Sequence, residues 1–552
     1  MSLYKKHKDA IDKALDAINK RSYYAAYPES PKAYDAALSA GGEAKYKAML
    51  NKRFQGLLSD GEADWVGEEA SPYTGENLGV LYPMFEPGLV VERAKAAMRE
   101  WKKIDAEERA GLLVETLERI KTKFFEIAYA TMHTSGQSFM MSFQASGPHS
   151  ADRAMEPIAL GLFELTRFPK DVKWVKPMGK FDVTIEKTFT PVPKGIGLVV
   201  GCSTFPVWNT LPGVFADLIT GNSVIVKPHQ KAVLPAAICV AEMQQVFREN
   251  NVDPYVVQLA ADTSDQLITK HFTEHPDVRL IDYTGSSGFG NYIESLPGKT
   301  VFTEKAGVNS VIVDSVKDLD AVLNNLAFSV SLYSGQMCTA PQNFFIPESG
   351  VKAGDKNYSY EEVIEKLKAQ LSGIAQHPKM GVGVLGALQN PATLQRVERM
   401  GVGTGSNVAL AYAEVKSEEF PSTRTVSPLL LQVTADDRNT YENELFGPIA
   451  VIVKTRDTEH SVALAKELAR THGAITCGAY STDNATIERI SEQMNEVFVP
   501  VTFNLTGPIW VNQHAAFSDF HVTGGNPAGN ASYTNPEFVI KRFVWVGNRK
   551  MV

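Results

Sequence analysis

The sequence predicts an α/β protein built on doubly wound parallel sheets, which carry helices on both faces. Between residues 193 and 290, apolar runs alternate with amphipathic stretches, as in consecutive strand–helix–strand units of about 30 residues. The runs GIGLVVGC and SVIVKPH are apolar throughout, as expected for strands buried on both faces. The runs NSVIVD, QNFFIPES and PIAVIVKT continue the pattern beyond residue 308 and indicate a second α/β unit.

The remaining elements follow from local periodicity. Residues 5–60 are predicted to be mainly helical, because apolar residues recur at spacings of three and four in IDKALDAINK and AKYKAMLNKRFQGLL. Further helices are expected near 89–104 and 106–131, and over VWNTLPGVFADLIT and KAVLPAAICVAEMQQVFREN. The final run PEFVIKRFVWVG alternates apolar and polar residues, which predicts an edge strand able to pair with another segment or subunit.

Composition excludes several classes of protein. The chain has 552 residues, 44% of them hydrophobic, and a net charge of −8 without a basic stripe, which makes nucleic acid an unexpected partner. No run reaches the roughly 18 apolar residues of a membrane span.

The four cysteines are scattered and include no C-x-x-C pair, so neither a disulfide scaffold nor a zinc site is expected. His271 and His275 lack a third ligand, and no metal is expected. The N-terminus lacks the apolar stretch of a signal peptide, and we expect a cytoplasmic protein.

Two features at predicted strand ends suit a phosphate-containing ligand. Gly285 and Ser286 lie in DYTGSSGFG, a turn in which backbone can approach a phosphate closely before a helix begins. Lys227 ends the run VIVK, where it can contact a ribose or phosphate at the edge of the sheet. An ordinary turn and a lysine reaching to solvent explain the same residues, so neither feature is decisive alone.

Three residues suit acyl chemistry, and each also has an ordinary explanation. Cys338, in LYSGQMCTAPQNFFI, can be a small buried side chain or a nucleophile. Glu304 ends the run VFTE and can be a surface residue or a general base. Asn209 can form a turn or donate to an oxyanion.

The order and spacing of these motifs are more specific than any one of them. Over residues 80–552 the chain carries VWN, KPHQ, YTGSSGFG, Glu304, GQMC and NELFGP in turn, with Glu304 34 residues before Cys338. In this respect it resembles the aldehyde dehydrogenase superfamily. The N-terminal 75 residues and the run MHTSGQSFMMSFQASGPH look like the subgroup called phenylacetic acid degradation protein PaaN.

The resemblance implies a division of the chain. It implies an aldehyde dehydrogenase-like fold with a Rossmann-like cofactor domain, residues 76–170 and 193–302, and a catalytic domain, residues 303–528. Residues 171–192 and 529–552 would form oligomerisation strands, and residues 1–75 a helical extension. The expected assembly is a homodimer or homotetramer. Because the chain ends at Val552, a fused ring-opening hydratase domain is not expected.

The resemblance also assigns roles. Cys338 would attack the aldehyde, Asn209 and the Cys338 backbone N–H would hold the oxyanion, and Glu304 would activate water for hydrolysis of the thioester. The cofactor would be NAD or NADP, held by residues that include Lys227, Gln230, Trp208, Gly285, Ser286, Glu444 and Phe446. Many members carry an acid where this chain has Gln230, and a neutral amide does not repel a 2′-phosphate, so NADP is the preferred prediction.

The expected substrate is an aldehyde, and within the subgroup a semialdehyde from aromatic or phenylacetate catabolism, with a CoA-linked form as one option. A CoA-acylating dehydrogenase is the first alternative, although Glu304 argues against it because such enzymes commonly lack this base. The second alternative is a catalytically silent binding protein on the same fold. The run EKAGVNS around Glu304 departs from the common family pattern. The loop HAAFSDFHVTGGNPAGNASY departs as well, and because this loop is expected to shape the substrate funnel, substrate specificity cannot be transferred.

Overall fold

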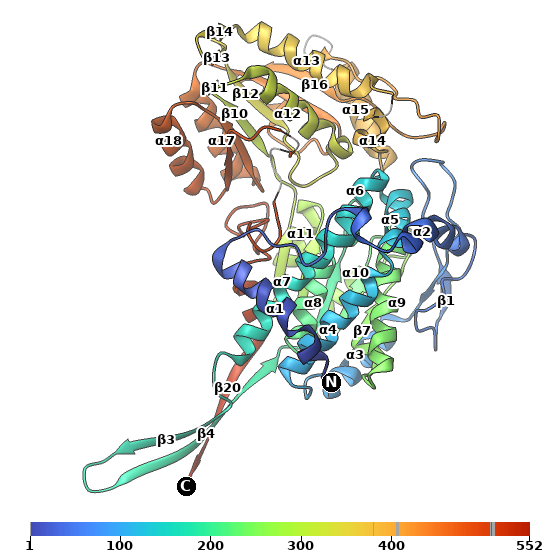
Figure 1. Ribbon diagram of the computed structural model, residues 1–552, viewed down its shortest axis with the longest axis vertical. Coiled ribbons are helices and arrows are strands. Elements are labelled where there is room, and N and C mark those ends of the chain that lie inside the picture. Colours follow the sequence, from blue (N-terminus) through green and yellow to red (C-terminus); the bar gives the residue numbers. More distant parts are fainter. Residues whose placement is uncertain (1, 379, 404–407, 508, 511–513) are drawn as a thin grey trace.

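The computed structural model (Figure 1) describes residues 2–378, 380–403, 408–507, 509–510 and 514–552. Two α/β units form the body, and a narrow three-stranded arm projects from one of them (Figure 1). The predicted fold class is therefore confirmed. In the part of the chain that the structure describes, no helix is both long and apolar enough to cross a membrane.

The first unit is built on a five-stranded, wholly parallel sheet with strand order β7-β6-β5-β8-β9. The order reverses beside β5, and parallel sheets of this kind bind ligands at the carboxyl ends of their strands near such a reversal. Lys227 and Glu304 are the last residues of β6 and β9, so both lie at this edge. The strands are β5 (Ile196–Val200), β6 (Val224–Lys227), β7 (Val257–Leu259), β8 (Val278–Thr284) and β9 (Thr300–Glu304).

Helices cover both faces of this sheet, and two of them correct the sequence predictions. The helix expected over 106–131 is two helices, because the chain turns at Thr122 and restarts with the buried Phe124. The helix expected over VWNTLPGVFADLIT begins only at Leu211, which leaves Trp208 and Asn209 in the preceding turn. The helices are α3 (Pro87–Trp101), α4 (Ala106–Lys121), α5 (Phe124–Ser135), α6 (Phe139–Gln144), the π-helix η2 (Ala145–His149), α7 (Ser150–Thr166), α8 (Leu211–Ile219), α9 (Leu234–Glu249), the 3₁₀ helix η3 (Pro254–Val256), α10 (Thr269–Glu274) and α11 (Ser287–Glu294).

The second unit contains a seven-stranded sheet with order β15-β16-β17-β12-β10-β18-β19, parallel except where β15 meets β16. Its strands are β10 (Ser310–Val313), β12 (Asn343–Pro347), β15 (Val408–Leu410), β16 (Leu429–Thr434), β17 (Ile449–Thr455), β18 (Cys477–Tyr480) and β19 (Val501–Phe503), beside a small sheet of β11 (Ser315–Val316), β13 (Val351–Ala353) and β14 (Lys356–Tyr358). Its helices are α12 (Leu319–Ser331), η4 (Leu332–Gly335), α13 (Tyr360–Gln376), α14 (Met380–Leu385), α15 (Pro391–Gly403), α16 (Arg438–Tyr441), α17 (Thr458–His472) and α18 (Asn484–Asn495).

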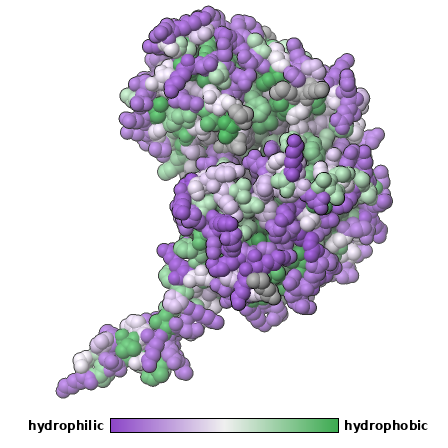
Figure 2. Space-filling model, in the orientation of Figure 1, coloured by the Kyte–Doolittle hydropathy of each residue, from purple (hydrophilic) through white to green (hydrophobic). Residues whose placement is uncertain are grey.

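The projecting arm is an antiparallel sheet of β3 (Asp171–Pro177), β4 (Asp182–Pro193) and β20 (Phe543–Met551), in the order β20-β4-β3. The predicted terminal strand is present, but the short helix α19 (Glu537–Ile540) replaces its beginning. Green and purple residues are mixed along the arm in Figure 2, and Phe181, Val175 and Met551 are 63%, 47% and 69% exposed. The arm therefore presents apolar surface that the described residues of this chain leave exposed.

The N-terminal extension packs against the first unit. Its elements are α1 (Leu3–Lys20), η1 (Pro31–Ala33), α2 (Ala36–Met49) and β1 (Asp64–Val66), which pairs with β2 (Tyr82–Met84). Ile11 and Ala14 of α1 belong to the same buried core as Leu113 of α4. A Cβ at Gly111 of α4 would lie 2.2 Å from the Tyr4 backbone nitrogen, so a glycine is needed for α1 to approach this closely. The extension is thus part of the first unit's core.

Candidate active site

Cys338 lies between two cavities. On one side is a groove of about 1000 Å³ at the carboxyl edge of the five-stranded sheet. On the other side is a cavity of about 440 Å³ whose lining combines aromatic residues and methionines with polar and charged side chains. Cys338, Asn209 and Phe205 line both cavities. A thiol in this position can reach a molecule in either space.

A strained turn presents the thiol. Tyr333 and Ser334 both have φ of 51°, in the left-handed region that side chains other than glycine rarely adopt. Buried hydrogen bonds hold this turn in place: the Tyr333 hydroxyl donates to the Ser135 carbonyl at 2.5 Å, and the Ser334 hydroxyl donates to the Leu385 carbonyl at 2.9 Å. Backbone strain of this kind persists where surrounding structure enforces it, commonly at functional sites.

The surroundings of Cys338 disfavour its thiolate. Burial and the neighbouring Glu304 carboxylate raise the pKa of the thiol well above its ordinary value. His521 Nε2 lies 3.5 Å from Sγ. The Asn309 side-chain amide donates to the Cys338 carbonyl at 2.8 Å, which fixes the backbone of the loop. The thiol is therefore held in place but needs a base to lose its proton.

Glu304 faces the same centre from the end of β9. Its Oε1 is 3.2 Å from His521 Nε2, and its Oε2 accepts from the Asn209 amide at 3.3 Å. Burial raises the pKa of this carboxyl, but His521, Cys338 and the Arg153 cation together bring it below its ordinary value. Glu304 is therefore ionised near neutral pH, as a general base requires.

Asn209 is aimed at the reacting groups. It is 7% exposed, and its amide nitrogen is 3.4 Å from the Tyr533 hydroxyl in addition to its contact with Glu304. An amide donor that lines both cavities beside the thiol is suitably placed to stabilise an oxyanion formed there.

Six residues expected to hold a cofactor line the groove: Lys227, Gln230, Gly285, Ser286, Glu444 and Phe446. Ser286 is the N-cap of α11, where its side chain makes no capping bond and no acidic residue occupies the first turn, so backbone N–H groups there remain available to a phosphate. Burial raises the pKa of the Glu444 carboxyl to about 7, and the Glu304 charge adds to this effect.

Lys227 is engaged within the protein. It is 2% exposed, and its Nζ lies 2.7 Å from Asp262 Oδ1 and donates to the Pro228 carbonyl at 2.7 Å. Gln230 donates to the Ser264 hydroxyl at 3.3 Å, and Ser264 in turn donates to the Glu68 carboxylate through its hydroxyl and backbone N–H. Glu68 comes from the N-terminal extension. Its neighbours in the sequence do not predict that its carboxylate lies near the carboxyl edge of the five-stranded sheet.

Trp208 lines the smaller cavity, whereas the residues lining the groove do not include it. Its ring is 4.6 Å from the His521 ring, at 74°. The position of Trp208 therefore favours contact with the molecule that reaches the thiol from the side opposite the groove, rather than the cofactor contact predicted from sequence.

Sequence reasoning missed several residues of the site. His521 and Tyr533 come from the loop that departs from the family pattern, and this departure was the only signal available. Arg153, on α7, is 1% exposed and lies over the Trp208 ring at 5.5 Å. The N-terminal extension contributes Tyr23, Tyr24, Ala25 and Glu29 to the smaller cavity.

The structure also brings together a trio with the donor atoms of a metal site. Among the described residues, Glu304, Cys338 and His521 are the only group of three or more His, Cys, Asp or Glu side chains whose possible ligand atoms all lie within 4.8 Å of one another. Two of the three are the residues expected to carry the acyl chemistry, so the trio belongs to the reaction centre. His271 lines the groove and is not a member of this trio.

The fold and this site define an NAD(P)-dependent oxidoreductase acting on aldehydes, and comparison with known proteins agrees. The profile of the aldehyde dehydrogenase family matches residues 70–539, and the chain belongs to this family. Within it, the chain is 42% identical to an NAD-dependent aldehyde dehydrogenase from Burkholderia multivorans of known crystal structure, with a TM-score of 0.97 over 100% of this chain and 99% of that one.

More distant relatives carry different names. A 1-pyrroline-5-carboxylate dehydrogenase of Bacillus subtilis is 27% identical over 61% of this chain, and the match spans 64% of that relative's length. A succinate-semialdehyde dehydrogenase [NADP(+)] of Deinococcus radiodurans is 25% identical over 80% of this chain and 86% of its own length. The 1-pyrroline-5-carboxylate dehydrogenase from Thermus with bound NAD, at 19% identity and a TM-score of 0.74, shares the fold.

Proposed function

We propose that this protein oxidises an aldehyde to the free carboxylic acid with NAD(P)⁺, through a thiohemiacetal and then a thioester on Cys338. The sulfur attacks the aldehyde carbon, and the Asn209 amide stabilises the resulting oxyanion. Bound NAD(P)⁺ supplies a hydride acceptor. Glu304 then takes a proton from water, which attacks the thioester and releases the acid. A thioester suits this step because a thiolate is a good leaving group.

The groove fits a dinucleotide. The groove is large enough for such a molecule. The diphosphate would lie at the uncapped start of α11 and at Gly285, which has no side chain. The Glu444 carboxyl group would bind ribose hydroxyls. A Cβ at Gly285 would lie 2.6 Å from the Tyr283 hydroxyl, so a larger residue here would displace the Tyr283 side chain. Lys227 and Gln230 would contact the adenosine side. The preference for NADP over NAD remains a prediction.

One observation carries the proposal: Cys338 and Asn209 line the groove and the aromatic cavity together, so a nucleophile and an oxyanion donor lie where cofactor and aldehyde would meet. The direct test follows NAD(P)H formation at 340 nm and identifies the product by mass spectrometry, with and without free CoA. We expect the free acid in both cases. An acyl-CoA formed only when CoA is present would favour the CoA-acylating alternative, and no reduction with any aldehyde would favour a binding protein.

The cavity suggests the class of aldehyde. Tyr24, Trp208, Phe328 and Met141 give it apolar lining. Arg153 pairs through Nη1 with Glu156 at 2.9 Å, and its Nη2, which has no hydrogen-bond partner among the described residues, is left to meet an anionic group. We therefore propose a bulky semialdehyde that carries an anionic group, consistent with a product of aromatic or phenylacetate catabolism. A comparison of kcat/KM for aliphatic aldehydes, aromatic aldehydes, semialdehydes and CoA-linked semialdehydes tests this, and equal values for charged and uncharged substrates would contradict it.

We also propose a homodimer or homotetramer assembled through the arm. The exposed Phe181, Val175 and Met551 support this, because apolar side chains on a narrow projection are expected to be covered by another subunit. Light scattering should give a mass at least twice the 60.5 kDa of the chain. Phe181→Lys combined with Val175→Lys should shift the mass toward the monomer.

A further inference from the structure

His521 touches both reacting groups of the site through one nitrogen. Its Nε2 is 3.5 Å from Cys338 Sγ and 3.2 Å from Glu304 Oε1. The side chain is 4% exposed. The proposed reaction requires the thiol to lose a proton. The Glu304 carboxylate, which is also hydrogen-bonded to this thiol, and the His521 imidazole are the two acceptors beside it.

Packing fixes the direction in which this imidazole points. Its ring is stacked on Tyr533, with centroids 5.7 Å apart and an interplanar angle of 6°. The edge of Trp208 closes another side at 4.6 Å. A ring held on two sides cannot swing away from the sulfur without disturbing the wall of the aldehyde cavity, so the contact is a built feature of the site.

The charges around the ring suit a proton acceptor. The titratable or charged groups that face it are Cys338, Glu304, Tyr533, His514 and Arg153. Burial lowers the pKa of His514 to about 3, so that neighbour is neutral. The Glu304 carboxylate lies 3.2 Å from Nε2, within reach of a proton that this nitrogen receives. Direct transfer of the thiol proton to Glu304 would instead leave the thiolate without an adjacent imidazolium.

We propose that His521 is a catalytic base that takes the thiol proton of Cys338 and holds it against Glu304. The S–H bond breaks, sulfur keeps the electron pair, and an N–H bond forms at Nε2 whose hydrogen is donated to Glu304 Oε1. The thiolate then attacks the aldehyde carbon. The proton returns to sulfur when the acyl group leaves. This step rests on Cys338 being the nucleophile of the proposed function.

The alternative is that His521 only positions Glu304, and reactivity of the thiol in the free enzyme separates the two. Iodoacetamide alkylates thiolates, so the rate at the Cys338 peptide, followed by mass spectrometry between pH 5 and 10, reports the thiolate without aldehyde or cofactor. His521→Gln and His521→Asn keep a polar side chain but cannot accept this proton. Glu304→Gln removes the charge and leaves the imidazole. His460→Gln, on α17 and outside both cavities, controls for loss of a histidine.

We expect both His521 variants to alkylate about 10²-fold more slowly at pH 7 and to recover only at high pH, since general bases contribute at least this much. Glu304→Gln should keep most of its reactivity at neutral pH, because losing the carboxylate weakens the support for the protonated imidazole but also removes the charge that raises the pKa of the thiol. His460→Gln should match the wild type. Should the His521 variants not fold, as judged by circular dichroism, the Glu304→Gln profile still decides, because loss of its neutral-pH reactivity would make Glu304 the base. Unchanged alkylation in folded His521 variants would overturn the proposal. It would leave the aldehyde oxidation itself untouched, which the Cys338→Ala variant tests separately.

Discussion

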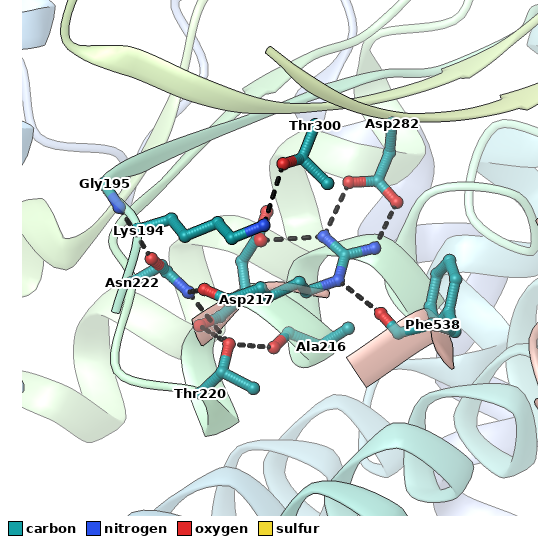
Figure 3. Close-up of polar contacts among 10 residues, drawn as sticks. Lys194, Gly195, Ala216, Asp217, Thr220, Asn222, Asp282, Thr300 and Phe538 are labelled. Carbon is teal, nitrogen blue, oxygen red and sulfur yellow. Dashed lines mark hydrogen bonds and ion pairs between the residues drawn. The ribbon is translucent and has the colours of Figure 1, made fainter. Parts of the chain in front are cut away.

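Arg542 and Asp282 form a two-pronged ion pair in the interior, in which Nη1 is 2.8 Å from Oδ2 and Nη2 is 2.6 Å from Oδ1. Nη1 also donates to Asp217 Oδ1 at 2.7 Å, and the guanidinium lies over the Phe302 ring at 4.0 Å. Figure 3 shows both carboxylates around this group, with Asn222 and Lys194 close by. Since Arg542 immediately precedes β20, the cluster joins the arm to β8 and α8.

Removing this cation should be strongly destabilising. Arg542→Met would leave two carboxylates buried and unpaired, and losing one partner of a buried pair typically costs about 3–5 kcal/mol. We expect a lower midpoint of urea unfolding and a smaller assembly in light scattering. Lys541→Met, an exposed neighbour that pairs with Glu537, is the control and should change little. Combining Arg542→Met with Asp217→Asn and Asp282→Asn should restore part of the loss, and no recovery would argue against unpaired charge as the cause.

The catalytic assignments predict losses of different size. Cys338→Ala should abolish NAD(P)H formation, because Cys338 is the thiol that lines both the groove and the aldehyde cavity, whereas Cys202 lines the groove alone. Asn209→Ala should lower kcat by about 10²–10³-fold while cofactor binding persists, as for loss of one oxyanion donor. Steady-state kinetics and cofactor titration measure the two effects. Cys239→Ala, in the core of α9, is the thiol control and should retain kcat. A fully active Asn209→Ala would remove this residue from the mechanism.

The sequence was informative where the chemistry is local and less so where it depends on packing. Cys338 and Glu304 lie at a turn and at a strand end, and the ordered motifs around them predict their roles. His521 lies 183 residues from Cys338, and only the folding of the C-terminal loop against β9 brings them together. The position of Trp208 could not be predicted for a related reason. Trp208 lies in a turn between two cavities, and its neighbours in the sequence do not reveal which cavity its ring faces.

Glu69 should make stability depend on pH. Its Oε1 accepts from the backbone N–H groups of Val233 and Leu234 where α9 begins, and burial raises the carboxyl pKa from 4.5 to about 7. The folded protein therefore holds a proton that the unfolded chain releases, and this stabilisation is lost as pH rises from about 4.5 to about 7.

Glu69→Gln keeps an oxygen for both N–H groups and cannot ionise. Its thermal midpoint relative to the wild type should therefore rise between pH 5 and 7 and stay level above that. Differential scanning fluorimetry across this range makes the measurement. Glu76→Gln, at an exposed position seven residues after Glu69, should show a constant difference. A constant difference for Glu69→Gln as well would show that the carboxyl titrates alike in the folded and unfolded chain.

The N-terminal extension should influence aldehyde selection. Asp152 Oδ1 accepts from the backbone N–H groups of Ala26 and Tyr27 at 3.0 and 3.2 Å, which fixes the segment that brings Tyr24 to the cavity. Asp152→Ala leaves two N–H groups unpaired, at a cost of about 1–3 kcal/mol each where they stay buried, and should release the segment.

We therefore expect Asp152→Ala to raise KM for a bulky aldehyde several-fold more than for propanal, with kcat for propanal nearly unchanged. Asp12→Ala, on the exposed face of α1, should leave both KM values as they are. Equal increases for the two aldehydes would mean that the segment supports the fold without shaping the cavity.

Cofactor preference depends on charge that reaches the groove from the extension. The neutral Gln230 favours NADP, but Lys227 is already paired with Asp262, and the Glu68 carboxylate lies one hydroxyl beyond Gln230 through Ser264. A carboxylate near a 2′-phosphate repels it, whereas it does not repel the uncharged ribose of NAD.

Glu68→Gln should therefore raise the ratio of kcat/KM for NADP to that for NAD by about tenfold, roughly 1.4 kcal/mol, mainly through KM for NADP. Initial rates with both cofactors at two salt concentrations measure this, and the effect should shrink at high salt because the interaction is screened. Glu76→Gln, at an exposed carboxylate nearby in the sequence, again serves as the control. A ratio unaffected by Glu68→Gln would leave Gln230 as the residue that sets the preference.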